Sequence, residues 1–321
     1  MVYYATMAAE RMVAMEYILQ TQGLTKKYKK HLAVNGASMN IARGDIYGFV
    51  GENGSGKTTI IRLITGLIFP NGGEFTLFGV KNTDPAIHAA RRKVGAIVES
   101  PSIYGNLCAY DNLKLQSTVL GLSGDDRIKQ VLEEVGLGEL YGDKKHAGNF
   151  SLGMRQRLGI AMALLGEPEF LILDEPMNGL DPAGIVEIRE LILRLNREKG
   201  ITFLISSHIL TELQLVANKY GIISKGRIIR EITEEQLHQE CARNTTIRAD
   251  KPAELEQLVR SLLPSHPISP VPEGVKITGE VNMNGLLAAI INANIQILTV
   301  NCTESSFEEY YLSMIGGGRN G

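Results

Sequence analysis

One nine-residue segment limits the folds open to this chain more than any other feature. Residues 51–59 read GENGSGKTT; the apolar run DIYGFV precedes them, and TTIIRLITGL, with apolar residues at helical spacing, overlaps and follows them. A strand, a glycine-rich loop and a helix in this order form a P-loop, in which backbone amides and the helix N-terminus converge on phosphate groups. A chance glycine-rich turn would not need the flanking strand and helix. We therefore predict an α/β P-loop NTPase.

Two side chains of this loop are expected to act on a bound nucleotide. Lys57 is placed to neutralise phosphate oxygens, and the hydroxyl of Thr58 is placed to ligate Mg2+. ATP and Mg2+ are therefore the predicted cofactors. The predicted nucleotide-binding residues of the loop are Gly51, Glu52, Asn53, Gly54, Ser55, Gly56, Lys57, Thr58 and Thr59.

A second candidate site lies where the apolar run LIL is followed by Asp174 and Glu175. Burying both carboxylates without compensation would be unfavourable, and a metal or a catalytic role relieves that cost. Asp174 is placed to hold Mg2+ through its water shell, and Glu175 to accept a proton from an attacking water. The alternative is a strand that runs into a solvated acidic turn. The P-loop upstream favours the catalytic interpretation.

The domain organisation follows from the periodicity of the apolar residues. FLILD and ITFLISS are continuous apolar runs separated by the helical pattern PAGIVEIRELILRLNREKG, as expected for parallel strands buried on both faces. We predict an ATPase domain over residues 15–240 with an inserted helical subdomain at about 84–165. Residues 241–321 alternate strands and helices around a proline-rich loop, which predicts a small α/β accessory domain with a flexible tail. Residues 1–14 are expected to be a disordered extension.

The composition limits the kinds of partner that the chain can bind and the cellular compartment in which it is expected. The 33 basic and 35 acidic residues leave a formal net charge of -2, which provides no positive field for nucleic acid. Cys108, Cys241 and Cys302 lie far apart, which argues against a zinc site or a disulfide framework and fits a reducing compartment. No apolar run reaches the roughly 18 residues that a membrane-spanning helix needs. We expect a cytoplasmic chain that does not cross the membrane by itself.

From Tyr17 to Ser224 the motifs resemble, in their order, the ATP-binding subunits of ABC transporters. SLGMRQ, which begins at Ser151, occupies the position of the family signature, usually Ser-Gly-Gly-Gln, and departs from it at Leu152 and Met154. The resemblance implies that Ser151 and Gly153 contact the γ-phosphate bound by the opposite subunit. From the residues alone, Ser151 is predicted to be the N-cap of the helix LGMRQRLGIAMALL. Both roles are compatible, because an N-cap also presents a helix terminus to phosphate.

Three further positions acquire roles through this resemblance. His208 matches the switch histidine, which contacts the γ-phosphate and orients the water together with Glu175. Tyr28 matches the aromatic residue that stacks on adenine. Glu99 stands where the family normally carries glutamine; a carboxylate there can still ligate Mg2+, directly or through water, but adds negative charge. Glu99, SLGMRQ and MNGLDP together look like the bacitracin-resistance and lantibiotic self-protection branch.

The resemblance implies an ATP-hydrolysing motor subunit of a transporter. Two copies would sandwich two ATP molecules, and a separate multi-span membrane permease would dock on the helical region near residues 99–112. The expected cargo is a peptide antibiotic or a similar amphipathic compound, exported by a complex in which this chain lies on the inner face of the cell membrane.

Two alternatives belong to different functional classes. A soluble ATPase of the same type could act on ribosomes or DNA without a permease. Ribosome-acting relatives usually carry two ATPase units, whereas this chain has one P-loop, and DNA-repair relatives insert a long coiled coil where only a short segment separates Gly51 from Ser151. A regulatory module that does not hydrolyse ATP is hard to reconcile with the complete set of site residues.

Overall fold

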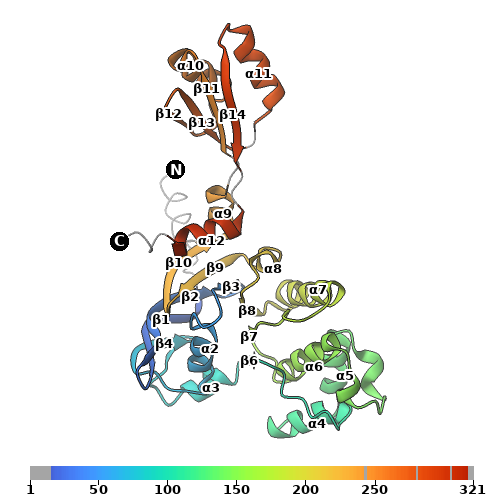
Figure 1. The fold of residues 1–321 in the computed structure, drawn as a ribbon. Helices are drawn as coiled ribbons and strands as arrows, with labels where there is room; N and C mark the ends of the chain where they lie inside the picture. Colours follow the sequence, from blue (N-terminus) through green and yellow to red (C-terminus); the bar gives the residue numbers. More distant parts are fainter. Residues whose placement is uncertain (1–15, 242–243, 280, 304–305, 317–321) are drawn as a thin grey trace, which may run out of the picture. The chain divides into compact units, whose positions relative to one another are not determined.

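The computed structural model describes residues 16–241, 244–279, 281–303 and 306–316 (Figure 1). The extension predicted over residues 1–14 and most of the predicted tail lie outside these ranges. The chain divides into two units, with the boundary between Glu234 and Glu235.

A six-stranded sheet of order β10-β9-β3-β8-β7-β6 forms the centre of the first unit. All neighbouring strands pair in parallel except β9 and β10, which form a hairpin with positive φ angles at Lys225 and Gly226. Every residue of β3, β7 and β8 is buried, and the predicted α/β fold is confirmed. The strands are β3 (Ile46–Val50), β6 (Val94–Ile97), β7 (Phe170–Asp174), β8 (Thr202–Ser207), β9 (Lys219–Ser224) and β10 (Arg227–Thr233).

Helices connect these strands, and their ends follow local capping rules. The longest is α7 (Pro182–Lys199), which begins with Asp181 accepting a hydrogen bond from the amide of Gly184 at 3.1 Å and ends at Gly200 with φ 66°. A proline at the first turn and a glycine after the last are typical of helix ends. The other connecting helices are α2 (Lys57–Thr65), α3 (Ile87–Arg91) and α8 (Leu210–Gln214).

A second, antiparallel sheet of order β2-β1-β4-β5 packs on the central one through a shared core. Leu24, Val34 and Phe75 of this sheet belong to the same buried cluster as Phe49 of β3 and Ile60 of α2. Helix α2, which carries the end of the P-loop, is therefore held by apolar contacts with both sheets. The strands are β1 (Tyr17–Tyr28), β2 (His31–Ala42), β4 (Gly72–Leu77) and β5 (Val80–Lys81).

The region predicted to be helical contains α3, three longer α-helices and one strand. Val94–Ile97 forms β6, which extends the central sheet at its edge by pairing with β7. The helices are α4 (Ala109–Val119), α5 (Asp126–Glu134) and α6 (Leu152–Leu164), with two short turns of 3-10 helix, η1 (Gly138–Tyr141) and η2 (Ala147–Asn149). Ion pairs tie this region to α7: Glu134 to Lys199 at 2.5 Å and Arg157 to Glu187 at 3.3 Å.

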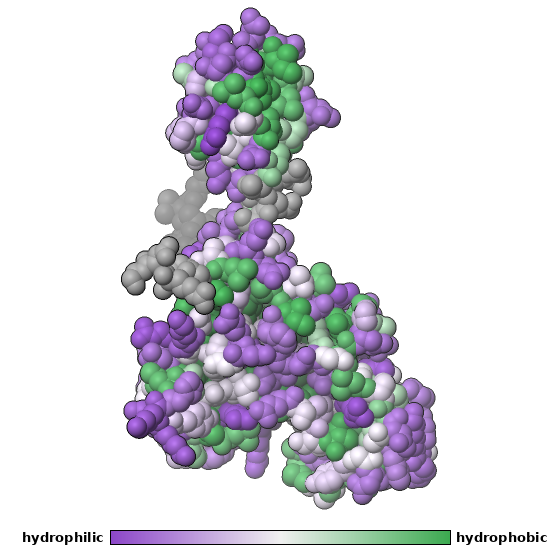
Figure 2. Space-filling model, viewed as in Figure 1, coloured by the Kyte–Doolittle hydropathy of each residue, from purple (hydrophilic) through white to green (hydrophobic). Residues whose placement is uncertain are grey.

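The second unit contains an antiparallel sheet of order β12-β13-β11-β14 with two helices in a split βαβ arrangement. Its core joins the two helices to the central strands, for example Val259 to Ile247 and Ile290. Hydrophobic residues also gather on its surface over α11 and β14 (Figure 2), where Ile291 and Leu298 are exposed. The elements are β11 (Asn244–Ala249), α10 (Pro252–Leu262), β12 (Ile268–Val271), β13 (Gly274–Thr278), α11 (Met283–Asn292) and β14 (Ile297–Thr303), with α9 (Glu234–Glu240) before them and α12 (Phe307–Gly316) after them.

One part of the proline-rich loop expected in this unit is a strand. Residues Ile268–Val271 form β12, with Pro270 opposite Val275 of β13. β12 lies at the edge of the sheet, where a proline that lacks an amide hydrogen is tolerated. The prediction of a loop was wrong because it relied on the high proline content of this segment, although a proline can be accommodated in an edge strand.

A buried hydrogen bond links β3 to β10 and should contribute to stability. Tyr47 is fully buried and donates its hydroxyl to Glu231 at 2.9 Å, and the amide of Asn40 donates to the same carboxylate oxygen at 3.0 Å. Burial, first, and then the nearby carboxylate of Glu231 raise the pKa of Tyr47 well above its usual value, so the phenol stays a neutral donor.

We predict that Tyr47→Phe lowers the free energy of unfolding by about 1–2 kcal/mol, because the partly buried carboxylate of Glu231 loses a donor. Urea denaturation measures the change. Tyr104→Phe, at an exposed side chain, is the matched control and should leave the midpoint unchanged. Equal stability of the two variants would contradict the prediction.

Candidate active site

The loop between β3 and α2 is held close to neighbouring backbone. A Cβ atom added at Gly51 would lie 2.6 Å from the carbonyl oxygen of Ile223, and one at Gly56 would lie 2.7 Å from the carbonyl oxygen of Ala33. Gly56 also has φ +113°, a conformation that residues with a side chain rarely adopt. Glycines at these positions are therefore required by the backbone path of the predicted phosphate-binding loop.

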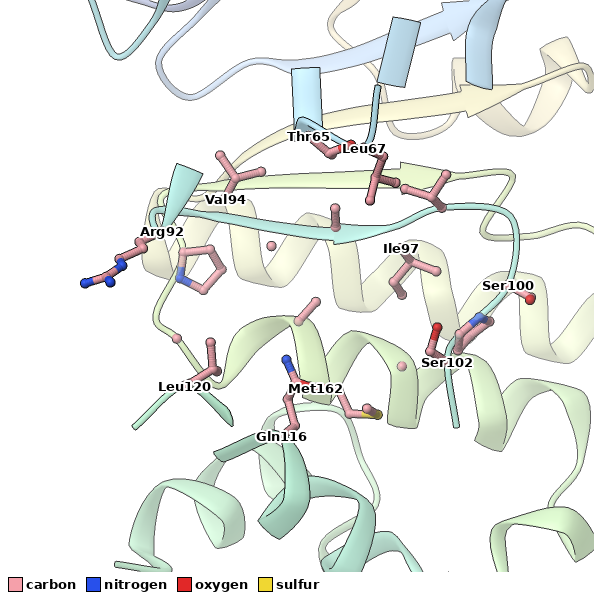
Figure 3. A pocket seen from close by; sticks show the side chains of 18 residues that line it. Thr65, Leu67, Arg92, Val94, Ile97, Ser100, Ser102, Gln116, Leu120 and Met162 are labelled. Atoms are coloured by element: carbon pink, nitrogen blue, oxygen red, sulfur yellow. The ribbon is translucent and has the colours of Figure 1, made fainter. Parts of the chain in front are cut away.

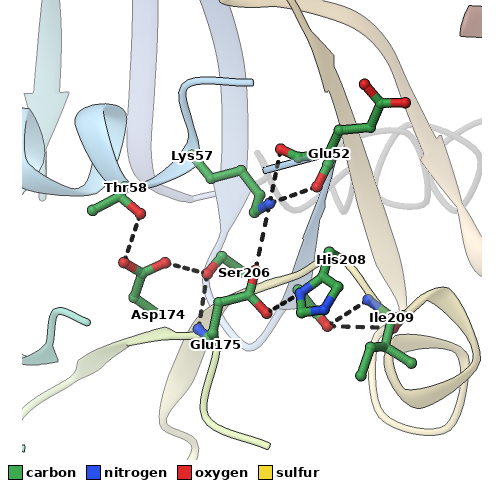
Figure 4. A network of polar contacts seen from close by, with 10 residues as sticks. Glu52, Lys57, Thr58, Asp174, Glu175, Ser206, His208 and Ile209 are labelled. Atoms are coloured by element: carbon green, nitrogen blue, oxygen red, sulfur yellow. Dashed lines mark hydrogen bonds and ion pairs between the residues drawn. The ribbon is translucent and has the colours of Figure 1, made fainter. Parts of the chain in front are cut away.

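The ammonium group of Lys57 lies inside this loop (Figure 4). It donates hydrogen bonds to the carbonyl oxygens of Gly51 at 2.5 Å and Glu52 at 3.3 Å, and it lies 3.4 Å from a carboxylate oxygen of Glu175. The side chain is almost fully buried, so its charge acts in a medium of low polarity. A buried ammonium group at the start of a helix is well placed to bind phosphate oxygens.

The carboxylate of Asp174 receives a hydroxyl donor on each oxygen (Figure 4). Thr58, at the start of α2, donates to Oδ2 at 2.8 Å, and Ser206, on β8, donates to Oδ1 at 2.5 Å. Asp174 is buried, so these hydrogen bonds offset part of the cost of removing the carboxylate from water. The structure thus brings together two of the predicted metal ligands, Thr58 and Asp174.

The oxygen atoms at this position suit Mg2+, which typically binds one or two protein carboxylates together with substrate phosphates and water. Thr58 and Asp174 fit this requirement.

Glu99, the third predicted metal ligand, has a cationic partner. Its side chain is 62% exposed and forms an ion pair with Arg62 of α2 at 2.5 Å. The backbone at Glu99 has φ 65°, which is uncommon for a residue with a side chain. The guanidinium of Arg62 offsets the extra negative charge that a carboxylate adds in place of glutamine. Its role toward Mg2+ stays a prediction, and the sequence pattern had not indicated Arg62.

Glu175 and His208, the two predicted catalytic residues, are in polar contact with each other. One carboxylate oxygen of Glu175 lies 2.8 Å from Nδ1 of His208, and the other faces Lys57 (Figure 4). The amide of Glu175 donates to the carbonyl oxygen of Ser206 at 3.1 Å and to its hydroxyl at 3.0 Å. The carboxylate is thus held between a cation and an imidazole at the end of β7, where it can accept a proton from a water.

Ser151, Gly153 and Tyr28 lie in other surroundings. The hydroxyl of Ser151 accepts a hydrogen bond from the amide of Met154 at 3.2 Å, which confirms the predicted N-cap of α6. A Cβ atom at Gly153 would meet Leu180 at 4.0 Å. Tyr28 is partly exposed at the end of β1. Within the described part of the chain, no hydrogen bond or ion pair joins these residues to the cluster around Lys57.

Comparisons with known proteins identify the family and the fold. The family described as ABC transporter matches residues 34–178. The bacitracin transport ATP-binding protein of Bacillus licheniformis is 40% identical over 96% of this chain and 100% of its own length. The lantibiotic transport ATP-binding protein of Streptococcus pyogenes is 45% identical over 67% of this chain and 90% of its own. A dimeric ATP-binding cassette in a post-hydrolysis state, bound to ADP and Pi, aligns with a TM-score of 0.61 and 26% identity, covering 67% of this chain and 98% of that one.

We predict that Gly56→Ala abolishes ATP binding, because the added methyl would displace the loop from Ala33 and the residue would be strained at φ +113°. Fluorescent-nucleotide titration measures the affinity. Gly142→Ala, where a Cβ atom meets nothing within 4 Å, is the control and should bind as the parent does. Retained binding in the Gly56 variant would show that the loop does not need glycine at this position.

Proposed function

Because this chain belongs to the family of ABC-transporter ATP-binding proteins, we propose that it powers the export of a peptide antibiotic or a similar amphipathic compound through a separate membrane permease. The chain is an ATPase and the ATP-binding subunit of a transporter. The cargo is inferred from two relatives, which are named for bacitracin and lantibiotic transport. The bacitracin relative matches along both units of the chain, which strengthens the inference. The alternative of an ATPase acting on ribosomes or DNA finds no support among these relatives.

The observation that carries the proposed mechanism is the position of the Glu175 carboxylate between Lys57 and His208. With the triphosphate in the P-loop, Lys57 would bind its terminal oxygens, and Glu175 would accept the proton of the attacking water while His208 orients the carboxylate. Thr58 and Asp174 would hold Mg2+, which supplies further neutralisation of the phosphate charge. Tyr28 would stack on the adenine ring.

Two copies of the chain would complete each site. Ser151 is exposed at the N-terminus of α6, and among the described residues it has no hydrogen bond or ion pair to Lys57, Asp174 or Glu175. A second copy would place its Ser151 and Gly153 against the γ-phosphate, where the helix terminus favours negative charge. The dimeric form of the related cassette supports this arrangement.

We predict that Glu175→Gln keeps ATP affinity and lowers the rate of hydrolysis by about a hundred- to ten-thousandfold, because the amide cannot accept the proton. Phosphate release measures turnover and nucleotide titration measures binding. Glu167→Gln, at an exposed position outside the cluster, is the control. Turnover near the parental rate in Glu175→Gln would rule out Glu175 as the base.

A cavity of about 450 Å3 offers a docking site for the permease (Figure 3). It lies where the end of α2 and the edge strand β6 approach α4 and α6, and Leu67, Ile97, Leu120 and Met162 are among its lining residues. The chain next to Leu67 and Leu120 also carries exposed apolar side chains, Phe69 at 77% and Val119 at 75%. Exposed apolar side chains beside a cavity are typical of a protein interface.

None of the helices in the described ranges is long and apolar enough to cross a bilayer. We place the chain on the inner face of the membrane through contact of this cavity with the permease. The cavity includes Ser100, Pro101 and Ser102, so a docked segment would contact the loop that begins at Glu99, a predicted metal ligand.

We predict that Val119→Arg reduces recovery of the permease in affinity purification from native membranes at least about tenfold, because a charge would be buried in an apolar contact. ATPase activity of the purified chain alone should be unchanged, since the Val119 side chain is highly exposed and is not one of the predicted nucleotide-binding, metal-binding or catalytic residues. Leu193→Arg, an exposed leucine on α7, is the control. Full recovery of a multi-span permease with Val119→Arg would move the docking site elsewhere.

A further inference from the structure

Ser206 is a buried serine whose hydroxyl forms hydrogen bonds with both Asp174 and Glu175. It lies on β8 directly opposite Asp174 of β7 and is 0% exposed. The hydroxyl donates to Oδ1 of Asp174 at 2.5 Å and accepts from the amide of Glu175 at 3.0 Å. A serine hydroxyl has one hydrogen to donate and lone pairs to accept, so both bonds can form at the same time.

The bond to Asp174 determines how its carboxylate is turned. One oxygen is held by Ser206 from β8 and the other by Thr58 from α2, so rotation about the Cβ–Cγ bond would break both contacts. Hydrogen bonds from hydroxyl groups to an ionised carboxylate are stronger than those between neutral groups. Ser206 therefore keeps one carboxylate oxygen directed toward Thr58, another predicted metal ligand.

The bond to Glu175 stabilises an uncommon backbone conformation. Glu175 has φ 52°, in the left-handed region, which costs energy in a residue with a side chain and occurs mainly where surrounding contacts enforce it. Its amide is held by both acceptors of Ser206, the carbonyl oxygen at 3.1 Å and the hydroxyl at 3.0 Å. This conformation directs the Glu175 side chain to Lys57 and His208.

We propose that Ser206 is a positioning residue for ATP hydrolysis, whose hydroxyl orients the Asp174 carboxylate toward the metal and holds the Glu175 backbone in place for proton transfer. The inference rests on the roles proposed above for Asp174 and Glu175. Ser206 would act only through these two residues, without direct contact to the nucleotide or the attacking water. Partners that orient a metal ligand typically contribute about 10- to 100-fold to metal affinity or activity.

Ser207 is a matched control next to it on the same strand. It is also largely buried, but its hydroxyl bonds to the backbone of Ile209, accepting from the amide at 2.9 Å. Ser207→Ala thus removes a buried hydroxyl of the same size without touching either acidic residue. Ser206→Cys is a second test variant, because it fills nearly the same space as serine while its thiol hydrogen-bonds weakly.

The experiment compares the full-length chain with Ser206→Ala, Ser206→Cys and Ser207→Ala. The first readout is the Mg2+ concentration that half-saturates the enhancement of ATP binding, measured by nucleotide titration in the Glu175→Gln background, where no turnover intervenes. The second is kcat in the parental background, and thermal unfolding reports folding. We expect both Ser206 variants to need about tenfold more Mg2+ and to lose about 10- to 100-fold in kcat, with Ser207→Ala close to the parent.

Parental Mg2+ dependence and kcat in both Ser206 variants would overturn the inference, as would equal losses in Ser207→Ala. Failure of the proposed function is distinguishable. If Glu175→Gln alone retains turnover, the assignment of the base fails. The Mg2+ dependence of binding is then measured with a non-hydrolysable ATP analogue and still tests the Ser206–Asp174 contact.

Discussion

The parallel pairing of β3, β7 and β8 is the constraint on which the site depends. These strands are buried along their whole length, so their backbone groups must pair with one another, and the pairing brings their carboxyl ends to one edge of the sheet. The P-loop, Asp174 with Glu175, and Ser206 with His208 each follow or end one of these strands. Their proximity results from backbone hydrogen bonding and needs no contact between the side chains themselves.

Charge compensation then determines how the side chains are arranged at that edge. Lys57 is buried beside Glu175, and Asp174 is buried between two hydroxyl groups. A buried charge without partners would be strongly unfavourable, so each group takes its partners from a different segment of the chain. The same contacts that compensate the charges also orient the proposed base, Glu175, and the proposed metal ligands. Stability and catalytic geometry therefore rest on the same hydrogen bonds.

Local patterns were sufficient for much of this arrangement, because the relevant physics acts within a few residues. The P-loop was predicted from a strand, glycines and a helix, and the Ser151 N-cap from a serine before an apolar periodic segment. Sequence patterns did not predict the secondary structure of two segments that form strands at the edge of a sheet. Val94–Ile97 is too short to be distinguished from its helical neighbours, and the segment around Pro270 forms a strand because the edge of the sheet tolerates proline.

The sequence by itself determined where the glycine loop, the acidic pair and the helices and strands that carry them lie, since glycine loops, caps and apolar periodicity are local properties. It also predicted their phosphate-binding and acid–base roles. Only the tertiary structure decided their partners. Arg62 forms an ion pair with Glu99, and Ser206 forms hydrogen bonds with both Asp174 and Glu175. The spacing of these residues along the chain predicts neither contact. The reason is physical: these partners meet through strand register and helix packing, which join segments far apart in sequence.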